Sequence, residues 1–203
     1  MSSLRIPLFP LGSVLFPDGP LPLRIFEPRY LHMVSTCMKT DSAFGVCLIR
    51  EGREVGEAAE PHNIGTLASI VDWAQLPDGL LGITALGGQR FQIDSKEIGK
   101  EQLITAEVDL IPEDPKVDVP DQYTQLVELV RRVLNQPDTL YEGLDWKLDE
   151  ASWVGNRLAE LLPLSMSEKQ ELLETTDPVL RLSQLHEAII QLATAAADEP
   201  DEE

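Results

Sequence analysis

The first forty residues alternate short apolar runs with prolines, and this pattern predicts two strands, a turn and a helix. The strands are expected at residues 5–9 and 21–26, both at sheet edges, because proline has no N–H for a central ladder. The Phe-Pro-Asp-Gly-Pro run at 16–20 predicts a chain reversal between them. A helix is expected to begin at Glu27-Pro28, and the residues predicted to face a core are Tyr30, Leu31, Val34 and Met38.

Strand signals continue to residue 111. Residues 51–63 are polar, with two glycines and a proline, and predict a loop. Reversals are expected at Pro77-Asp78-Gly79 and at Gly87-Gly88. The expected strands are residues 43–50, 64–76, 80–86, 89–93 and 103–111. Five or six strands with short turns and one helix predict a closed or nearly closed sheet.

Residues 112–120 contain three prolines and predict a stiff linker at a domain boundary. After them, the spacing of apolar residues changes from a period of 2 to a period of 3.6. One helix is expected near 123–134 and a second near 149–162. A third is expected from Ser167, in a capping box with Gln170, to about Thr175, and the last after Asp177-Pro178. The predicted domains are a β-rich lobe at 1–112, a linker at 113–120, a helical bundle at 121–197 and a disordered acidic tail at 198–203.

Residues 7–34, PLFPLGSVLFPDGPLPLRIFEPRYLHMV, resemble the opening of the amino-terminal substrate-recognition domain of Lon proteases. The resemblance continues over about residues 4–195. It is carried by IGTLA at 64–68, LPDG at 76–79, GGQRF at 87–91, residues 158–173 and DPVLRL at 177–182. It implies an α+β fold in which a β-rich lobe related to PUA-like pseudo-barrels precedes a helical lobe. It also implies a role in recognising unfolded or degradation-prone segments.

Composition narrows the class of protein. The 203 residues carry a formal net charge of −19, and residues 1–112 hold nine basic and fourteen acidic side chains. This balance argues against a nucleic-acid partner, which gains affinity from clustered Lys and Arg. The sequence has no 18-residue apolar run and no leader pattern at its start, so we expect a cytoplasmic protein without a membrane span. The two cysteines, Cys37 and Cys47, are expected to be buried, reduced thiols.

Motifs for catalysis are missing from the sequence. There is no GxxxxGK[ST] phosphate loop and no GxSxG elbow, although the resembled proteases carry ATPase and peptidase domains. The histidines, His32, His62 and His186, fall on three separate expected elements, which is a poor basis for a catalytic or metal cluster. We therefore predict no catalytic residue, no cofactor and no metal site, and a chain that is not an enzyme.

Candidate binding residues cluster in the opening stretch. Glu27 is interpreted either as a contact for a bound peptide backbone or as half of a buried ion pair with Arg29, Arg90 or Arg24, and the ion pair is favoured. Five large apolar residues there either fill a barrel end or line an apolar groove at a sheet edge. The predicted peptide-binding set is Phe9, Phe16, Pro17, Leu23, Phe26, Glu27, Arg29, Tyr30 and Arg90. Trp73, Trp146 and Trp153 are further candidates, although Trp73 on a strand and Trp153 at a helix start are first of all packing residues.

The sequence thus predicts a non-catalytic module that binds exposed apolar segments of unfolded or client proteins, with a separate ATPase or protease as a conceivable partner. Burial of apolar side chains would supply affinity, and edge-strand hydrogen bonds would supply orientation. Two alternatives stay open at this point. One is RNA binding by a PUA-like fold, and the other is a small hydrolase with a site at the junction of the lobes.

Overall fold

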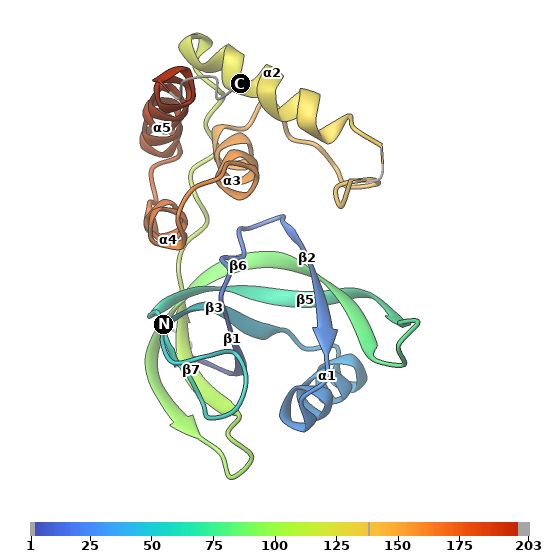
Figure 1. Ribbon diagram of the computed structural model, residues 1–203. Helices are drawn as coiled ribbons and strands as arrows, with labels where there is room; N and C mark the ends of the chain where they lie inside the picture. The colour runs from blue at the N-terminus through green and yellow to red at the C-terminus, as the bar shows by residue number, and fades with distance from the viewer. Residues whose placement is uncertain (1–2, 138, 199–203) are drawn as a thin grey trace. The chain divides into compact units, whose positions relative to one another are not determined.

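A computed structural model describes residues 3–137 and 139–198 (Figure 1). Internal contacts divide the chain into two compact units. The first unit contains the described residues up to Glu113 together with Ser165–Leu173. The second contains Asp114–Leu164 and the described residues from Glu174 onward. The predicted tail lies outside the described residues from position 199 onward.

The first unit is built on a sheet that closes on itself. Five of its strands pair in the order β1-β7-β6-β5-β3, and β3 pairs back onto β1. The two other strands in the described part of the chain attach at the side, β4 to β3 and β2 to β6. The strands are β1 Leu4–Leu11, β2 Pro20–Ile25, β3 Phe44–Glu51, β4 Glu60–Pro61, β5 Ile64–Gln75, β6 Leu81–Ile98 and β7 Ile104–Leu110. The α+β class and the closed sheet predicted from the sequence are confirmed.

The edge-strand prediction is right for β2 and wrong for β1. β2 pairs with β6, whereas β1 pairs with both β7 and β3. The prolines of β1 are tolerated because its two halves use different partners. Pro7 lies in the half that is registered with β7, and Pro10 lies in the half that is registered with β3. Each proline can therefore turn the side that lacks an N–H away from the ladder.

The predicted reversal at Gly87-Gly88 is wrong, because β6 runs straight through both glycines. At Gly87 the loop between β1 and β2 comes against the strand. The Asp18 N–H donates to the Gly87 carbonyl at 2.8 Å, and the Gly87 N–H donates to the Gly19 carbonyl at 2.9 Å. Gly87 is therefore a point of close approach between two backbones rather than a turn.

Helix α1, Pro28–Thr40, begins where the sequence predicted and closes one side of the core. Its buried apolar side chains are Tyr30, Met33, Val34 and Cys37, and they pack with Phe9, Phe44 and Ile83 in one cluster. The predicted core face is thus partly wrong, since Leu31 is only partly buried and Met38 is exposed. A shift of one residue along the helix rotates the buried stripe by about 100°.

Both cysteines are free and buried, as predicted. Burial raises the pKa of the Cys47 thiol to about 12. Because the thiolate is the reactive form, we expect neither Cys47 nor Cys37 to react appreciably with Ellman's reagent at pH 8 in the folded protein. Two thiols per chain should react once the protein is unfolded in guanidinium. Rapid native labelling of a Cys37→Ser variant, which retains Cys47, would contradict the burial of Cys47.

The second unit is helical, and contacts of Asp114 hold the segment that leads into it. Its helices are α2 Thr124–Leu134, α3 Ala151–Leu161 and α5 Pro178–Asp198, after a short 3₁₀ turn at Asp121–Tyr123. Asp114 pairs with the buried Arg181 at 2.9 Å and accepts the Ser152 hydroxyl hydrogen bond at 2.7 Å. Asp177 caps α5 by accepting the Val179 N–H at 2.9 Å, as its sequence predicted.

Helix α4, Met166–Glu174, is grouped with the sheet over all but its last residue. The Arg90 guanidinium donates to the Leu173 carbonyl at 2.5 Å, and the Gln170 amide donates to the Ile64 carbonyl. The predicted capping box is displaced by two residues. Ser165 and Glu168 form it, and hydrogen bonds from Ser165 lower the pKa of Glu168. The domain limits at 112 and 120 stay predictions.

Candidate functional site

Three aromatic members of the predicted peptide-binding set lie in the core. Phe9 and Tyr30 stack with ring centroids 3.9 Å apart, and Phe16 is fully buried. Burial raises the pKa of Tyr30 to about 12, so its hydroxyl stays neutral. These residues fill the barrel, which is the structural alternative considered for them.

Charged members of the set act as internal ties. Arg29 is buried and pairs with Glu27 at 3.0 Å, so the favoured ion-pair interpretation of Glu27 is confirmed with Arg29 as its partner. The same guanidinium donates to the carbonyls of Gln102, at 2.9 Å, and Glu54, at 3.3 Å. It therefore joins the start of α1 to two loops. Arg90 is also buried, where it holds α4 as described above.

The remaining members of the set reach the surface. Phe26 is 53% exposed, while Leu23 and Pro17 are half-buried. Leu23 belongs to β2, which pairs with β6 alone and therefore has a free edge. A peptide-binding role for any member of the set stays a prediction. Leu23 is the member whose surroundings are described next, because it lies on a strand with a free edge.

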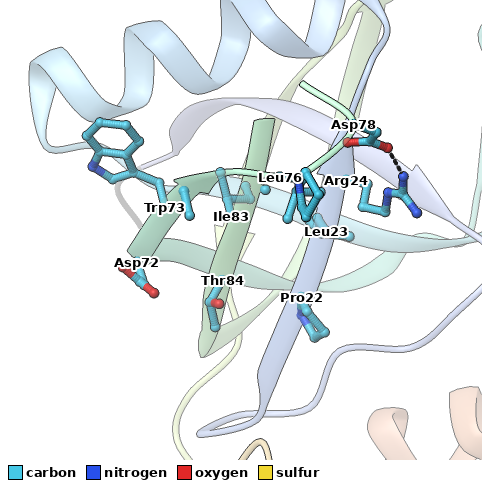
Figure 2. A pocket seen from close by; sticks show the side chains of 12 residues that line it. Pro22, Leu23, Arg24, Asp72, Trp73, Leu76, Asp78, Ile83 and Thr84 are labelled. Atoms are coloured by element: carbon cyan, nitrogen blue, oxygen red, sulfur yellow. Dashed lines mark hydrogen bonds and ion pairs between the residues drawn. The ribbon is translucent and has the colours of Figure 1, made fainter. Parts of the chain in front are cut away.

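Leu23 lines an apolar groove of about 710 Å³ formed by residues 22–24, 72–74, 76–78 and 82–84, which we call the edge groove (Figure 2). Three adjacent strands build it. Leu23 on β2 is the register partner of Ile83 on β6, and Ile83 is also the register partner of Trp73 on β5. Directly opposed residues point to the same side of a sheet, so these three side chains form a row across it.

The β5–β6 hairpin shapes one end of the groove. Its turn is closed by a 2.8 Å hydrogen bond from the Leu76 N–H to the Leu80 carbonyl, and Gly79 supplies the positive φ of 85°. Leu76 packs over Gly82, where a Cβ would lie 2.9 Å from its Cδ2 atom. Arg24 of β2 forms an ion pair with Asp78 of the turn, which Figure 2 shows beside Leu23 and Leu76. Arg24 thus neutralises the negative charge of the Asp78 carboxylate.

Trp73 lies at the other end of the groove. The sequence predicts first of all a packing role for it, yet 60% of its surface is exposed. The indole points away from Asp72 and toward α1 in Figure 2. Trp153, by contrast, is buried as predicted. A large exposed indole in an apolar groove is a feature of binding surfaces, where Trp is enriched among residues that dominate affinity.

The described residues provide little for metal or covalent chemistry. No group of three or more His, Cys, Asp or Glu side chains is placed to hold a metal ion in residues 3–137 and 139–198. His32 pairs with the exposed Glu101 at 3.1 Å, and His186 packs edge-on against Tyr123. None of the helices in the same residue ranges is long and apolar enough to cross a membrane.

The structure defines the class of fold: an α+β module in which a closed sheet with one covering helix carries an apolar groove at its free-edged strand. The chain belongs to the ATP-dependent protease La (LON) substrate-binding domain family, which matches residues 5–191. The predicted family and the predicted Lon-type substrate-recognition module are thereby confirmed. The family is the substrate-binding part of the protease.

The relatives found by sequence similarity are Lon proteases that are much longer than this chain. The chain is 28% identical to the Lon protease of Buchnera aphidicola subsp. Schizaphis graminum, over 84% of this chain and 23% of that protein. It is 27% identical to Lon protease 2 of Herpetosiphon aurantiacus, over 94% of this chain and 24% of that protein. The chain therefore spans about a quarter of the length of these relatives.

Solved structures agree with the fold. A Lon N-terminal domain protein from Xanthomonas campestris is 37% identical, with a TM-score of 0.75, and the match covers 90% of this chain and 96% of that one. The N-terminal domain of the Mycobacterium avium complex Lon protease is 20% identical, with a TM-score of 0.63 and the same coverage. The second likeness supports the fold alone.

Proposed function

We propose that the edge groove is where this module binds exposed apolar side chains of unfolded or client polypeptides. The observation that carries the proposal is Trp73, whose exposed indole extends the row formed with Leu23 and Ile83. An apolar side chain entering the groove would be removed from water, at about 25 cal/mol per Å² of apolar surface buried. Trp73 would supply the largest part of that surface.

Orientation of the bound segment would rest on side chains more than on backbone pairing. β2 has a free edge, but Pro20 and Pro22 lack N–H groups, so the strand is a poor template for an added strand. This modifies the mechanism expected from the sequence, in which edge-strand hydrogen bonds orient the peptide. The groove remains available because its walls are side chains.

Association with a separate ATPase or protease belongs to the same proposal. It is supported by the relatives, which are Lon proteases roughly four times the length of this chain. A cytoplasmic location is also proposed, and the two free thiols agree with a reducing compartment.

We expect Trp73→Ala to weaken polypeptide binding by about 30-fold, the effect of removing a tryptophan that dominates an interface. The measurement is fluorescence anisotropy of a fluorescein-labelled, reduced and carboxymethylated lactalbumin titrated with the protein at low and high salt. Binding driven by apolar burial should persist at high salt.

The matched control for Trp73→Ala is Ile98→Ala, because Ile98 is 56% exposed and lies at the opposite end of β6. Its binding should equal that of the wild type. Equal weakening by both substitutions, or no weakening by either, would remove the groove from the proposal. A labelled single-stranded RNA provides a second ligand. Retention of RNA alone, fading with salt, would favour the RNA-binding alternative instead.

A further inference from the structure

The second half of β5 has a free edge beside Trp73. β3 is registered with β5 no further than Ala68, whereas β6 is registered with it as far as Gln75. Residues 69–75, which we call the β5 overhang, therefore have a strand on one side only. Their sequence, SIVDWAQ, contains no proline, so every residue in the overhang keeps its N–H. The overhang differs in this respect from β2, whose prolines make it a poor template.

The register of the β5–β6 hairpin indicates which backbone groups reach this edge. The hairpin is closed by the hydrogen bond between Leu76 and Leu80. Bonded and non-bonded positions alternate in an antiparallel pair, so Ala74 bonds to β6, whereas Gln75 and Trp73 direct their N–H and C=O groups away from β6. Within residues 3–137 and 139–198, no other element forms a backbone hydrogen bond with these four groups. Two donors and two acceptors are thus left at the edge.

A β-bulge limits the usable length of the overhang. The register with β6 shifts between Ile70 and Asp72 and is regular from Asp72 to Gln75. Bulges are one of the features by which proteins prevent pairing at their sheet edges. Pairing with another chain is therefore expected at Trp73 and Gln75, next to the edge groove, rather than along the whole overhang.

The space beside the overhang is open. A hollow of about 250 Å³ borders residues 69–73, and its other wall is the end of α1 and the residues after it, at positions 37, 38, 41 and 42. Val71 and Met38 leave exposed apolar surface there. Neighbouring strands lie about 4.8 Å apart, so a strand added to the overhang would enter a space that is already present.

Trp73 connects the overhang with the edge groove. Its side chain extends the row formed by Leu23 and Ile83, while its backbone groups face the free edge. A residue paired with Trp73 would direct its side chain to the same side of the sheet, next to the indole. One extended segment can therefore place an apolar side chain against Trp73 and bond to the overhang through its backbone.

We propose that an extended segment of the client polypeptide adds to the β5 overhang as a strand, through the N–H and C=O groups of Trp73 and Gln75. This inference rests on the proposed function of the edge groove and names its substrate class. The main-chain groups of a folded protein are already paired, whereas those of an unfolded segment are available. The overhang thus selects extended chain of any sequence, and the groove selects an apolar side chain within it.

The test uses three labelled peptides of one sequence, with a single Phe among Ser and Thr residues. The first is unmodified, the second carries N-methyl groups on the Phe and on every second residue from it, and the third carries them on the intervening residues. Side chains on the Trp73 side of an added strand belong to residues whose N–H faces β5, because both features alternate with the same period. We expect the second peptide to bind about tenfold more weakly than the first, and the third to bind as the first does.

A proline substitution tests the same edge on the protein. Gln75→Pro removes a donor from the edge and keeps the ladder with β6, because the Gln75 N–H faces away from β6. It should weaken binding of the unmodified peptide by about fivefold.

The matched control is Ile98→Pro. Ile98 also lies one residue before the closing hydrogen bond of its hairpin, which runs from Gly99 to Leu103, and β5 does not extend beside it. Its binding should equal that of the wild type. Equal weakening by both proline substitutions would contradict strand addition at the overhang. Dimerisation that Gln75→Pro abolishes and Ile98→Pro does not, seen by sedimentation, would assign the edge to a second copy and also overturn the proposal.

The two proposals fail in different ways. If all three peptides bind equally well and all depend on Trp73, the edge groove stands and strand addition is wrong. If the unmodified peptide does not bind, or binds Trp73→Ala as well as the wild type, the groove and strand addition fall together.

Discussion

Replacing Gly87 with alanine is expected to lower the free energy of unfolding by about 3 kcal/mol, whereas alanine at the adjacent Gly88 should change it by less than about 1 kcal/mol. A Cβ at Gly87 would lie 2.1 Å from the carbonyl oxygen of Phe16. That neighbour is backbone next to a fully buried ring, so it cannot rotate aside. At Gly88 the nearest atoms belong to Leu67, at 3.6 and 3.8 Å, which is ordinary contact.

Urea denaturation followed by circular dichroism would measure both glycine variants, and hydrogen exchange would assign the change to the first unit. The Asp18 N–H, which donates to the Gly87 carbonyl, should lose protection in Gly87→Ala and keep it in Gly88→Ala. Equal loss of stability in the two variants would contradict the close approach. It would point instead to a general intolerance of side chains in this part of β6.

This glycine pair also shows where sequence interpretation stops. A Gly-Gly pair between two strand signals is typical of a turn, and equally of a strand that another backbone approaches. The strand signals on either side were correct, since both lie within β6. What decides between the two outcomes is the loop at residues 15–19, and its position depends on pairings distant in the sequence.

The same limit applies to the site. The apolar opening stretch identified the family, because its motif is specific, but not which of its side chains would be exposed. Phe9 and Phe16 are buried in the core, whereas Phe26 is exposed. An ion pair for Glu27 could be predicted because a buried charge needs a counter-charge close by, but the choice of Arg29 over Arg90 and Arg24 came from the structure.

The exposure of Trp73 could not have been predicted from its own segment. The first part of β5 is registered with both β3 and β6, whereas the part that carries Trp73 is registered with β6 alone. One side of the strand is therefore open at this position, and the indole remains exposed. How far β5 extends beyond β3 depends on the relative lengths of the two strands. The amphipathic pattern of β5 alone does not predict this.

Glu160→Ala is expected to destabilise the second unit by about 3–5 kcal/mol, the usual effect of removing one partner from a buried ion pair. The Arg157 side chain is completely buried on α3 and lies 3.1 Å from Glu160. Glu160 also accepts the Tyr141 hydroxyl hydrogen bond at 2.8 Å. Burial, and then the charge of Glu160, hold the pKa of Tyr141 well above its usual range, so the hydroxyl remains a neutral donor. The substitution removes the carboxylate that pairs with Arg157 and the acceptor of Tyr141 together.

Three variants separate the charge of Glu160 from its packing. Glu160→Gln keeps an acceptor for Tyr141 and should lose roughly half as much stability as Glu160→Ala. Glu187→Ala removes an exposed carboxylate of α5 and should have little effect. Arg157→Met/Glu160→Leu replaces both charges by apolar groups and should recover most of the loss, because the large penalty arises from an uncompensated charge rather than from the absence of a pair. Thermal unfolding is followed by tryptophan fluorescence in a Trp73→Phe background, so that the signal comes from Trp146 and from Trp153, which stacks against Arg157, both in this unit. Arg157 also lies over the rings of Trp153 and Tyr141. If the double variant were less stable than Glu160→Ala, the pair together with these two aromatic contacts would be a net source of stability, and the charge-compensation argument would be wrong.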